Sequence, residues 1–134
     1  MGFIQAKPGK IVMAKLSPGE DLAKSVIETA KKAGIGSGVF FMIGTLKQVT
    51  MGFYSPVMTP VTIKEPLEIV SCIGNIAKRD GELATHAHIT VTDSKLHSYG
   101  GHMLDGCTVD RVAELTIFEL AGVSLERTAT GLNI

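Results

Sequence analysis

Residues 85–92 have the sequence THAHITVT, and the alternation of side chains in this stretch decides the fold class. Successive side chains of a β-strand point to opposite faces of a sheet. One face of this strand would carry the polar residues, including His86 and His88, and the other only alanine, isoleucine and valine. The stretch therefore predicts a half-buried strand whose apolar face packs on a core.

A hairpin is predicted directly before this strand. Residues 67–77 and 83–92 are both β-compatible, and they flank the segment KRDGE at 78–82. Asp-Gly between two such runs is a strong signal for a tight turn between antiparallel strands.

Three further regions are predicted to be extended. Residues 10–16 form a short apolar run that is compatible with a strand. In residues 109–120, Ala113, Leu115 and Ile117 would share one face and Glu114 and Thr116 the other; the composition would also allow a helix, but the β-branched residues and the preceding turn at 105–106 favour a strand. Gly44 and Gly52 interrupt a long β-like stretch at 39–54, so we expect either two strands there or one strand with a bulge. The sheet is therefore expected to be mostly antiparallel.

One main helix is predicted between the first two of these strands. Ser17-Pro18-Gly19-Glu20 is typical of a helix start, with Ser17 as the N-cap, Pro18 in the first turn and Glu20 closing a capping box. An apolar stripe at helical spacing follows, formed by Leu22, Ala23, Val26, Ile27 and Ala30. The fold class is therefore α+β, with a mostly antiparallel central sheet and one main helix packed on it.

The glycine-rich segment 34–38 allows two interpretations. Phosphate-binding loops follow a strand and open a helix, whereas this segment follows the predicted helix and opens an apolar run. A helix C-cap is the interpretation that we adopt.

Composition limits the range of functions. The 134 residues fit one domain, taken here as 1–134, and a hydrophobic content of 45% suffices for one core. The 13 basic side chains balance the 13 acidic ones, which argues against a surface that coats nucleic acid. Cys72 and Cys107 have no metal-ligand or redox spacing and are expected to be buried. No signal peptide or membrane span is apparent, so we expect a cytoplasmic protein that does not bind membranes.

The histidines carry the most informative chemistry. Side chains two apart on a strand, such as His86 and His88, can converge on one ion. His102 follows Gly100-Gly101, where the backbone can bend and approach closely, and it is the candidate third ligand. Three nitrogen ligands would leave a coordination position open on a divalent transition metal, most readily zinc. The alternative is three histidines that lie on a hydrophilic sheet face by coincidence.

Two other polar residues are candidates for a role. His97 lies near a turn beside Tyr99 and is expected to be exposed and not a ligand. Glu114 is polar on a strand that is otherwise apolar; it is either a general base near the metal or, as we favour, part of a subunit interface.

The order of motifs from Pro66 to Leu120 resembles the plants-and-prokaryotes conserved (PPC) domain. The resemblance rests on LEIVSCIGNI at 67–76, His86-Ala87-His88, YGGHM at 99–103 and GCTV at 106–109. The capped helix followed by Gly38 to Gly44 is compatible with it, so the resemblance covers nearly the whole chain.

The resemblance implies a homotrimer with a central antiparallel sheet and, in prokaryotic members, a metal held by residues matching His86, His88 and His102. In plants the domain is joined to AT-hook DNA-binding motifs, and prokaryotic members share the DNA-binding label. This chain has no Arg-Gly-Arg-Pro hook and no net charge, which argues against direct DNA binding.

Three functions follow as hypotheses. The first is a trimeric metal-binding PPC-domain protein with a regulatory or DNA-binding role, and the second a zinc-type enzyme that acts on a small molecule at the three histidines. The third is a purely structural assembly domain.

Overall fold

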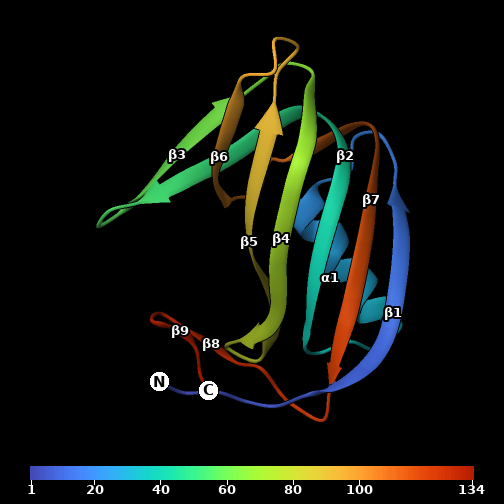
Figure 1. Cartoon of the computed structure of the whole chain (residues 1–134), viewed down its shortest axis with the longest axis vertical. Coiled ribbons are helices and arrows are strands. Elements are labelled where there is room, and N and C mark those ends of the chain that lie inside the picture. Colours follow the sequence, from blue (N-terminus) through green and yellow to red (C-terminus); the bar gives the residue numbers. More distant parts are fainter.

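An antiparallel sheet of seven strands makes up most of the computed structural model, which describes residues 1–134 (Figure 1). Its strands run in the order β1-β7-β2-β4-β5-β6, and β3 pairs with β2 outside this path. A separate two-stranded hairpin, β8–β9, follows at the C-terminal end. The strands are β1 (Lys7–Leu16), β2 (Gly38–Tyr54), β3 (Met58–Ile63), β4 (Leu67–Arg79), β5 (Glu82–Thr92), β6 (Ser98–Met103), β7 (Thr108–Ala121), β8 (Arg127–Thr128) and β9 (Gly131–Leu132).

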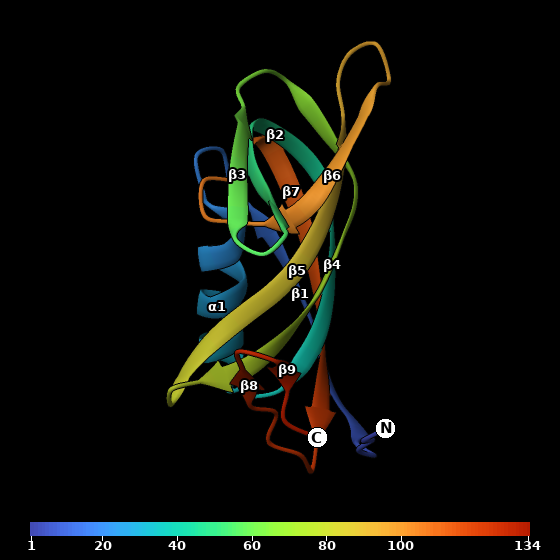
Figure 2. The same ribbon diagram turned by 90° about the vertical axis from the view of Figure 1, so that its left-hand side faces the viewer.

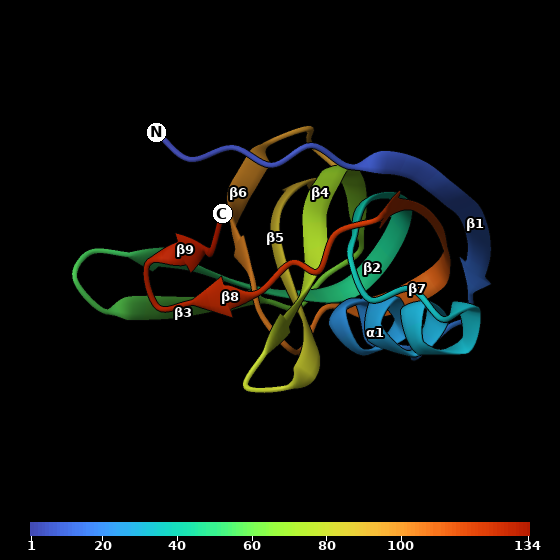
Figure 3. The same cartoon turned by 90° about the horizontal axis from the view of Figure 1, so that it is seen from below.

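The long strand β2 curls the sheet. Its first part pairs with β7 and β4, whereas its end pairs with β3 and with β6, where Gly52 lies opposite His102. The register shifts around Gly44, whose φ of 144° favours glycine. Of the two predicted alternatives, the structure has one strand with a bulge. The β2–β3 hairpin extends away from the rest of the sheet (Figure 3).

The helix α1 (Leu22–Ala33) covers one face of the sheet (Figure 2). Four of the five residues of its predicted apolar stripe, all but Ile27, join a core cluster of 24 buried residues, to which the inward-facing side chains of the sheet contribute most. Ile27 is half-buried. Cys72 and Cys107 are buried in this core and free, as predicted. The mostly antiparallel sheet with one helix is confirmed, but only 12 residues are helical here, so the chain is more β-rich than the label α+β suggests.

The predicted start of the helix was wrong. Asp21, not Ser17, is the N-cap, and its side chain accepts a hydrogen bond from the Lys24 amide at 3.2 Å. Residues 17–20 form a turn instead, in which the Glu20 amide donates to the Ser17 carbonyl and Gly19 has a φ of 91°. One half of the predicted capping box is present, since the Glu20 carboxylate accepts from the Ser17 amide. Pro-Gly at the centre of a four-residue segment is itself a turn signal, and here it outweighs the capping pattern.

The end of the helix matches the prediction. Gly34 adopts the left-handed conformation with a φ of 67°, and its amide donates to the Lys31 carbonyl. The Ile35 amide donates to the Ala30 carbonyl, which completes a Schellman-type cap. The glycine-rich segment therefore terminates the helix and does not cradle a phosphate.

The face of the sheet that is turned away from α1 is apolar and solvent-exposed. We call it the outer apolar face, and its members have exposed fractions between 40% and 75%: Ile11, Met13, Val39, Phe41, Ile43, Val70 and Ile73. They lie on the three strands β1, β2 and β4, and β7 lies between β1 and β2 in the sheet. An exposed apolar surface that spans several strands is typical of a protein–protein interface.

The helix α1 has 12 residues and falls short of the length and apolar character that a membrane-spanning helix needs.

Candidate metal centre

The three predicted ligands converge. One nitrogen from each of His86, His88 and His102 lies within 4.8 Å of the other two. The ring centroids are 5.5 Å apart for His86 and His88, 4.7 Å for His86 and His102, and 5.6 Å for His88 and His102. Residues that are up to 16 positions apart in the sequence are thus brought to one point by strand pairing.

Strand register explains this convergence. His86 and His88 stand two positions apart on β5 and share its outward face, because Ala87 between them is buried. His102 on β6 lies directly opposite His88. Directly opposed residues on antiparallel strands have Cβ atoms about 5 Å apart, so the third imidazole reaches the first pair.

The glycine before His102 lets β6 approach its neighbours. A Cβ atom on Gly101 would lie 2.9 Å from the Gly52 carbonyl oxygen on β2, closer than side chains are found in proteins. The close approach expected at Gly100-Gly101 is therefore confirmed at the second of these glycines. It allows β6 to pair with both β5 and β2.

The surroundings of the cluster favour neutral imidazoles. Burial, followed by the positive charge of Arg127 and the neighbouring rings, lowers the pKa of His86. Burial, His88 and Arg127 lower the pKa of His102 in the same way. Because a metal binds only the unprotonated nitrogen, both shifts keep lone pairs available at neutral pH.

The donor set fits a borderline transition metal. Nitrogen ligands about 2 Å from a tetrahedral zinc ion lie roughly 3.3 Å apart, so small rotations of the three rings would bring them to binding distance. Imidazole nitrogen suits zinc and its neighbours better than calcium or magnesium, which prefer oxygen ligands. Three ligands would leave one tetrahedral position to a further group.

The other two candidates, His97 and Glu114, lie outside the cluster. His97 is exposed, as expected, and its Nδ1 lies 3.1 Å from the Asp93 carboxylate in the turn between β5 and β6. Glu114 is exposed on β7, opposite Ile43 of β2 and Lys15 of β1. Since β2 and β4 separate β7 from β5, the alternative of a general base near the metal was wrong; a place for Glu114 in an interface stays a prediction.

Two polar residues beside the cluster were missed at the level of sequence. Arg127 on β8 donates from Nη2 to the Asn75 side-chain oxygen at 2.6 Å, and Asn75 lies opposite His86 in the pairing of β4 with β5. Burial and the nearby Arg79 lower the pKa of Arg127. No local pattern in the sequence marks Arg127, which follows the last predicted strand. Asn75 does have a signal, because an asparagine in an otherwise apolar strand indicates a polar contact there.

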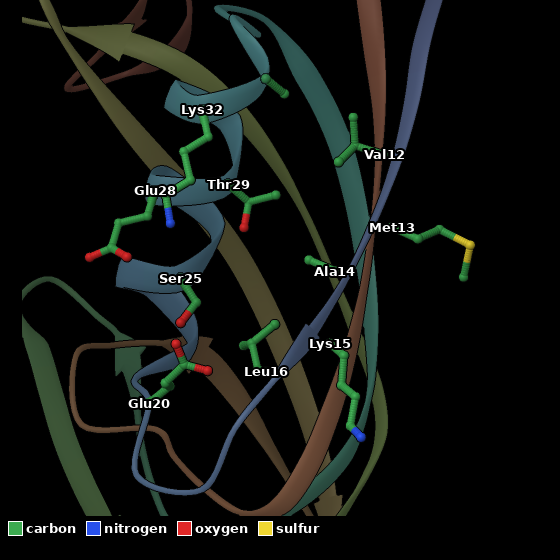
Figure 4. Close-up of a pocket in the computed structure, with 11 residues that line it drawn as sticks. Val12, Met13, Ala14, Lys15, Leu16, Glu20, Ser25, Glu28, Thr29 and Lys32 are labelled. Atoms are coloured by element: carbon green, nitrogen blue, oxygen red, sulfur yellow. The ribbon is translucent and has the colours of Figure 1, made fainter.

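Two clefts lie away from the histidines. One, of about 420 Å³, runs between β1 and α1 and is bordered by Lys15, Glu20, Glu28 and Lys32 (Figure 4). The other, of about 340 Å³, is a hollow in the outer apolar face between Phe41, Ile43 and Ile73. Neither is lined by a histidine. Within the cluster His88 is exposed, whereas His86 and His102 are half-buried.

Known proteins of similar sequence share this fold. The chain matches the model of the Plants and Prokaryotes Conserved (PCC) domain over residues 4–121. It is similar to the structure of a plant- and prokaryote-conserved (PPC) protein from Pyrococcus horikoshii, with 30% identity and a TM-score of 0.89 over 100% of this chain and 96% of that one. It is also similar to a metal-containing protein from Archaeoglobus fulgidus, with 27% identity and a TM-score of 0.88 over 100% and 98% of the two chains.

Two further similarities broaden the comparison. A protein from Ralstonia eutropha that is provisionally classed as DNA-binding has 28% identity and a TM-score of 0.79 over 87% of this chain and 81% of that one. The bifunctional protein GlmU of a Synechococcus strain is 30% identical over 109 residues, which is 81% of this chain but only 16% of that protein. The chain thus spans about a sixth of the length of the curated relatives that it matches. With the family model matched across most of its length, the chain belongs to the plants-and-prokaryotes conserved domain family.

Proposed function

We propose that this protein is a homotrimeric metal-binding protein in which His86, His88 and His102 hold a divalent transition metal, most readily zinc. The observation that carries the proposal is the convergence of three imidazole nitrogens within 4.8 Å on one sheet face. The metal-containing protein from Archaeoglobus fulgidus, which shares the fold, supports it. When bound, such an ion would supply Lewis acidity to a group in the open coordination position.

The outer apolar face supports the trimer. It exposes seven large apolar side chains across neighbouring strands, with the hollow at Phe41, Ile43 and Ile73 at its centre. Covering it with further copies of the chain would remove this area from water, which is the dominant favourable term in most associations. Two buried free cysteines suit the reducing cytoplasm in which we expect the protein to act.

Metal analysis tests the site. Tag-free protein should contain close to one zinc-type ion per chain by elemental analysis, and His88→Ala should reduce affinity for zinc by ~100-fold or more, since changes that spare the ligands themselves already cost about 10–100-fold. His97→Ala is the matched control and should bind zinc like the unaltered protein, because His97 lies outside the cluster. The proposal would be overturned if metal-free protein took up no zinc during dialysis against a zinc solution.

A metal-dependent reaction on a small molecule is the second candidate function. The set of three ligands and the exposure of His88 favour it, because a fourth group could then reach the ion. Screening esters, phosphoesters and lactones should then reveal a turnover that is lost in His102→Ala. No turnover with any of these substrates would leave the metal in a binding role only.

DNA binding is the function that the Ralstonia eutropha protein suggests for this chain. The balance of 13 basic and 13 acidic side chains argues against it, because phosphate contacts depend on an excess of lysine and arginine. We expect no DNA binding in a fluorescence anisotropy titration at low salt, where phosphate contacts are strongest. Binding that weakens steeply as salt is added would contradict this expectation.

A further inference from the structure

A single arginine beside the histidine cluster has a donor without an acceptor. The Nε–H of Arg127 is buried and makes no hydrogen bond within the protein. The same guanidinium is anchored through Nη2, which donates to the Asn75 oxygen at 2.6 Å. Buried donors are nearly always satisfied, so an unsatisfied Nε–H on an anchored side chain points to an acceptor that comes from outside the chain.

The anchor places this donor at the metal centre. Asn75 and His86 lie directly opposite each other on β4 and β5, and opposed residues have Cβ atoms about 5 Å apart. The guanidinium held by Asn75 is thus within side-chain reach of the three imidazoles. The positive charge of Arg127 contributes to the lowered pKa of both His86 and His102.

The local charge favours an anion. The two ion pairs of the protein lie elsewhere, between Lys31 and Glu82 and between His97 and Asp93, so no carboxylate of the chain neutralises Arg127. Arg79 adds a second positive charge nearby. A guanidinium offers its N–H groups as a planar fork that matches carboxylate and phosphate oxygens.

The C-terminal segment fixes the position of Arg127. The Lys78 amide of β4 donates to the Leu125 carbonyl at 2.8 Å, and the Leu125 amide donates to Ser37 Oγ at 2.9 Å. Figure 1 shows the β8–β9 hairpin beside the end of β4. The hairpin follows the residues that match the family model, which end at 121, so Arg127 lies outside the matched region.

We infer that Arg127 and the three histidines form one binding site for a small oxyanion, a carboxylate or a phosphate, with the Arg127 Nε–H as the donor that selects the anion. The inference rests on the proposed function in that the metal would supply a further positive charge beside Arg127. It narrows the ligands or substrates of this centre to molecules that carry such a group.

Anion titrations of zinc-loaded and metal-free protein test the inference. Acetate and phosphate are titrated separately, and the Arg127 Nε–H resonance is followed in ¹H–¹⁵N spectra, assigned by its absence in Arg127→Gln. We expect it to shift and saturate with at least one of the two anions. Calorimetry should show that Arg127→Gln weakens binding of that anion to the zinc-loaded protein by roughly tenfold or more, the typical effect of a charge-assisted hydrogen bond.

A second readout separates ligand recognition from a purely structural role. Removing a positive charge beside a cation should leave zinc affinity unchanged or raise it, so Arg127→Gln should bind zinc at least as tightly and the anion more weakly. A structural lesion would weaken both. Arg111→Gln is the matched control, because Arg111 is exposed on β7, away from the cluster, and it should change neither affinity.

Failure of the two proposals is distinguishable. If zinc does not bind but the metal-free protein still shows an anion response that depends on Arg127, the proposed function is overturned and the inference stands. If zinc binds and Arg127→Gln retains the full anion affinity, or if the Nε–H resonance responds to neither anion, the inference is overturned and the proposed function stands.

Discussion

Ile73 of β4 and His88 of β5 lie directly opposite each other on the outward side of the sheet. They belong to one cross-strand row, in which each residue is paired with the next: Met13, Thr116, Phe41, Ile73, His88 and His102. The row begins in the outer apolar face and ends in the histidine cluster. The proposed trimer interface and the proposed metal centre are therefore contiguous on one surface.

Ile73→Glu should dissociate the trimer. Ile73 is 64% exposed in the single chain and lines the hollow in the outer apolar face, so a carboxylate there would be forced out of water at a packed interface. Light scattering coupled to size-exclusion chromatography should show a shift from trimer to monomer. Val57→Glu, at an equally exposed position on the β2–β3 hairpin, is the control and should leave the mass unchanged. A trimeric Ile73→Glu protein would contradict the placement of the interface.

The metal-free protein should lose stability as the pH falls below about 6.5. His86 and His102 have pKa values below this ordinary value in the folded chain, chiefly because of burial. Below 6.5 the unfolded chain therefore binds more protons than the folded one, so the free energy of unfolding decreases as the pH falls and levels off below the folded-state pKa values. Urea denaturation at pH 8, 6 and 5 measures this slope.

A double replacement is the control for this pH dependence. His86→Gln combined with His102→Gln should flatten the change in stability between pH 8 and pH 5, while His97→Gln should not flatten it. An identical slope in all three proteins would show that other groups control the acid sensitivity.

The sheet and the pairing of His86 with His88 on one face could be predicted from the sequence because their signals are local. Alternation around His86 and His88 and the Asp-Gly turn at 80–81 both depend on residues that are neighbours in the chain. The strand β6 was harder to predict, since two glycines lower its intrinsic strand preference. It forms because β5 and the end of β2 hold it from both sides.

The pairing of Arg127 with Asn75 could not be predicted from the sequence. Their contact joins residues 52 positions apart and depends on where the C-terminal segment packs against β4. No periodic pattern or turn residue encodes such a long-range contact. The choice of Asp21 as the N-cap also depends on a long-range contact. The Gly106 amide, in the segment before β7, donates to the Asp21 carboxylate at a distance of 2.7 Å.

Asp21→Ala should destabilise the protein more than Ser17→Ala. Asp21 caps the helix through the Lys24 amide and also accepts from Gly106, whereas the Ser17 side chain caps nothing. Loss of an N-cap costs about 1–2 kcal/mol, and the free energy of unfolding from urea denaturation should fall by about this amount in Asp21→Ala only. Equal effects of the two substitutions would restore Ser17 as the start of the helix.

Gly101→Ala should weaken metal binding without touching a ligand. The new Cβ would lie 2.9 Å from the Gly52 carbonyl oxygen and 3.3 Å from Met51 Cγ, and because the nearest of these atoms is backbone, β6 has to move away from β2. Such overpacking costs about 1–3 kcal/mol of stability, and the movement carries His102 away from His88. Gly100→Ala is the neighbouring control, since its Cβ meets the Thr90 hydroxyl oxygen at 3.2 Å, a contact that a side-chain rotation relieves. Zinc affinity should therefore fall in Gly101→Ala and change little in Gly100→Ala. Equal zinc affinities in these two variants would mean that the position of β6 against β2 does not control the third ligand.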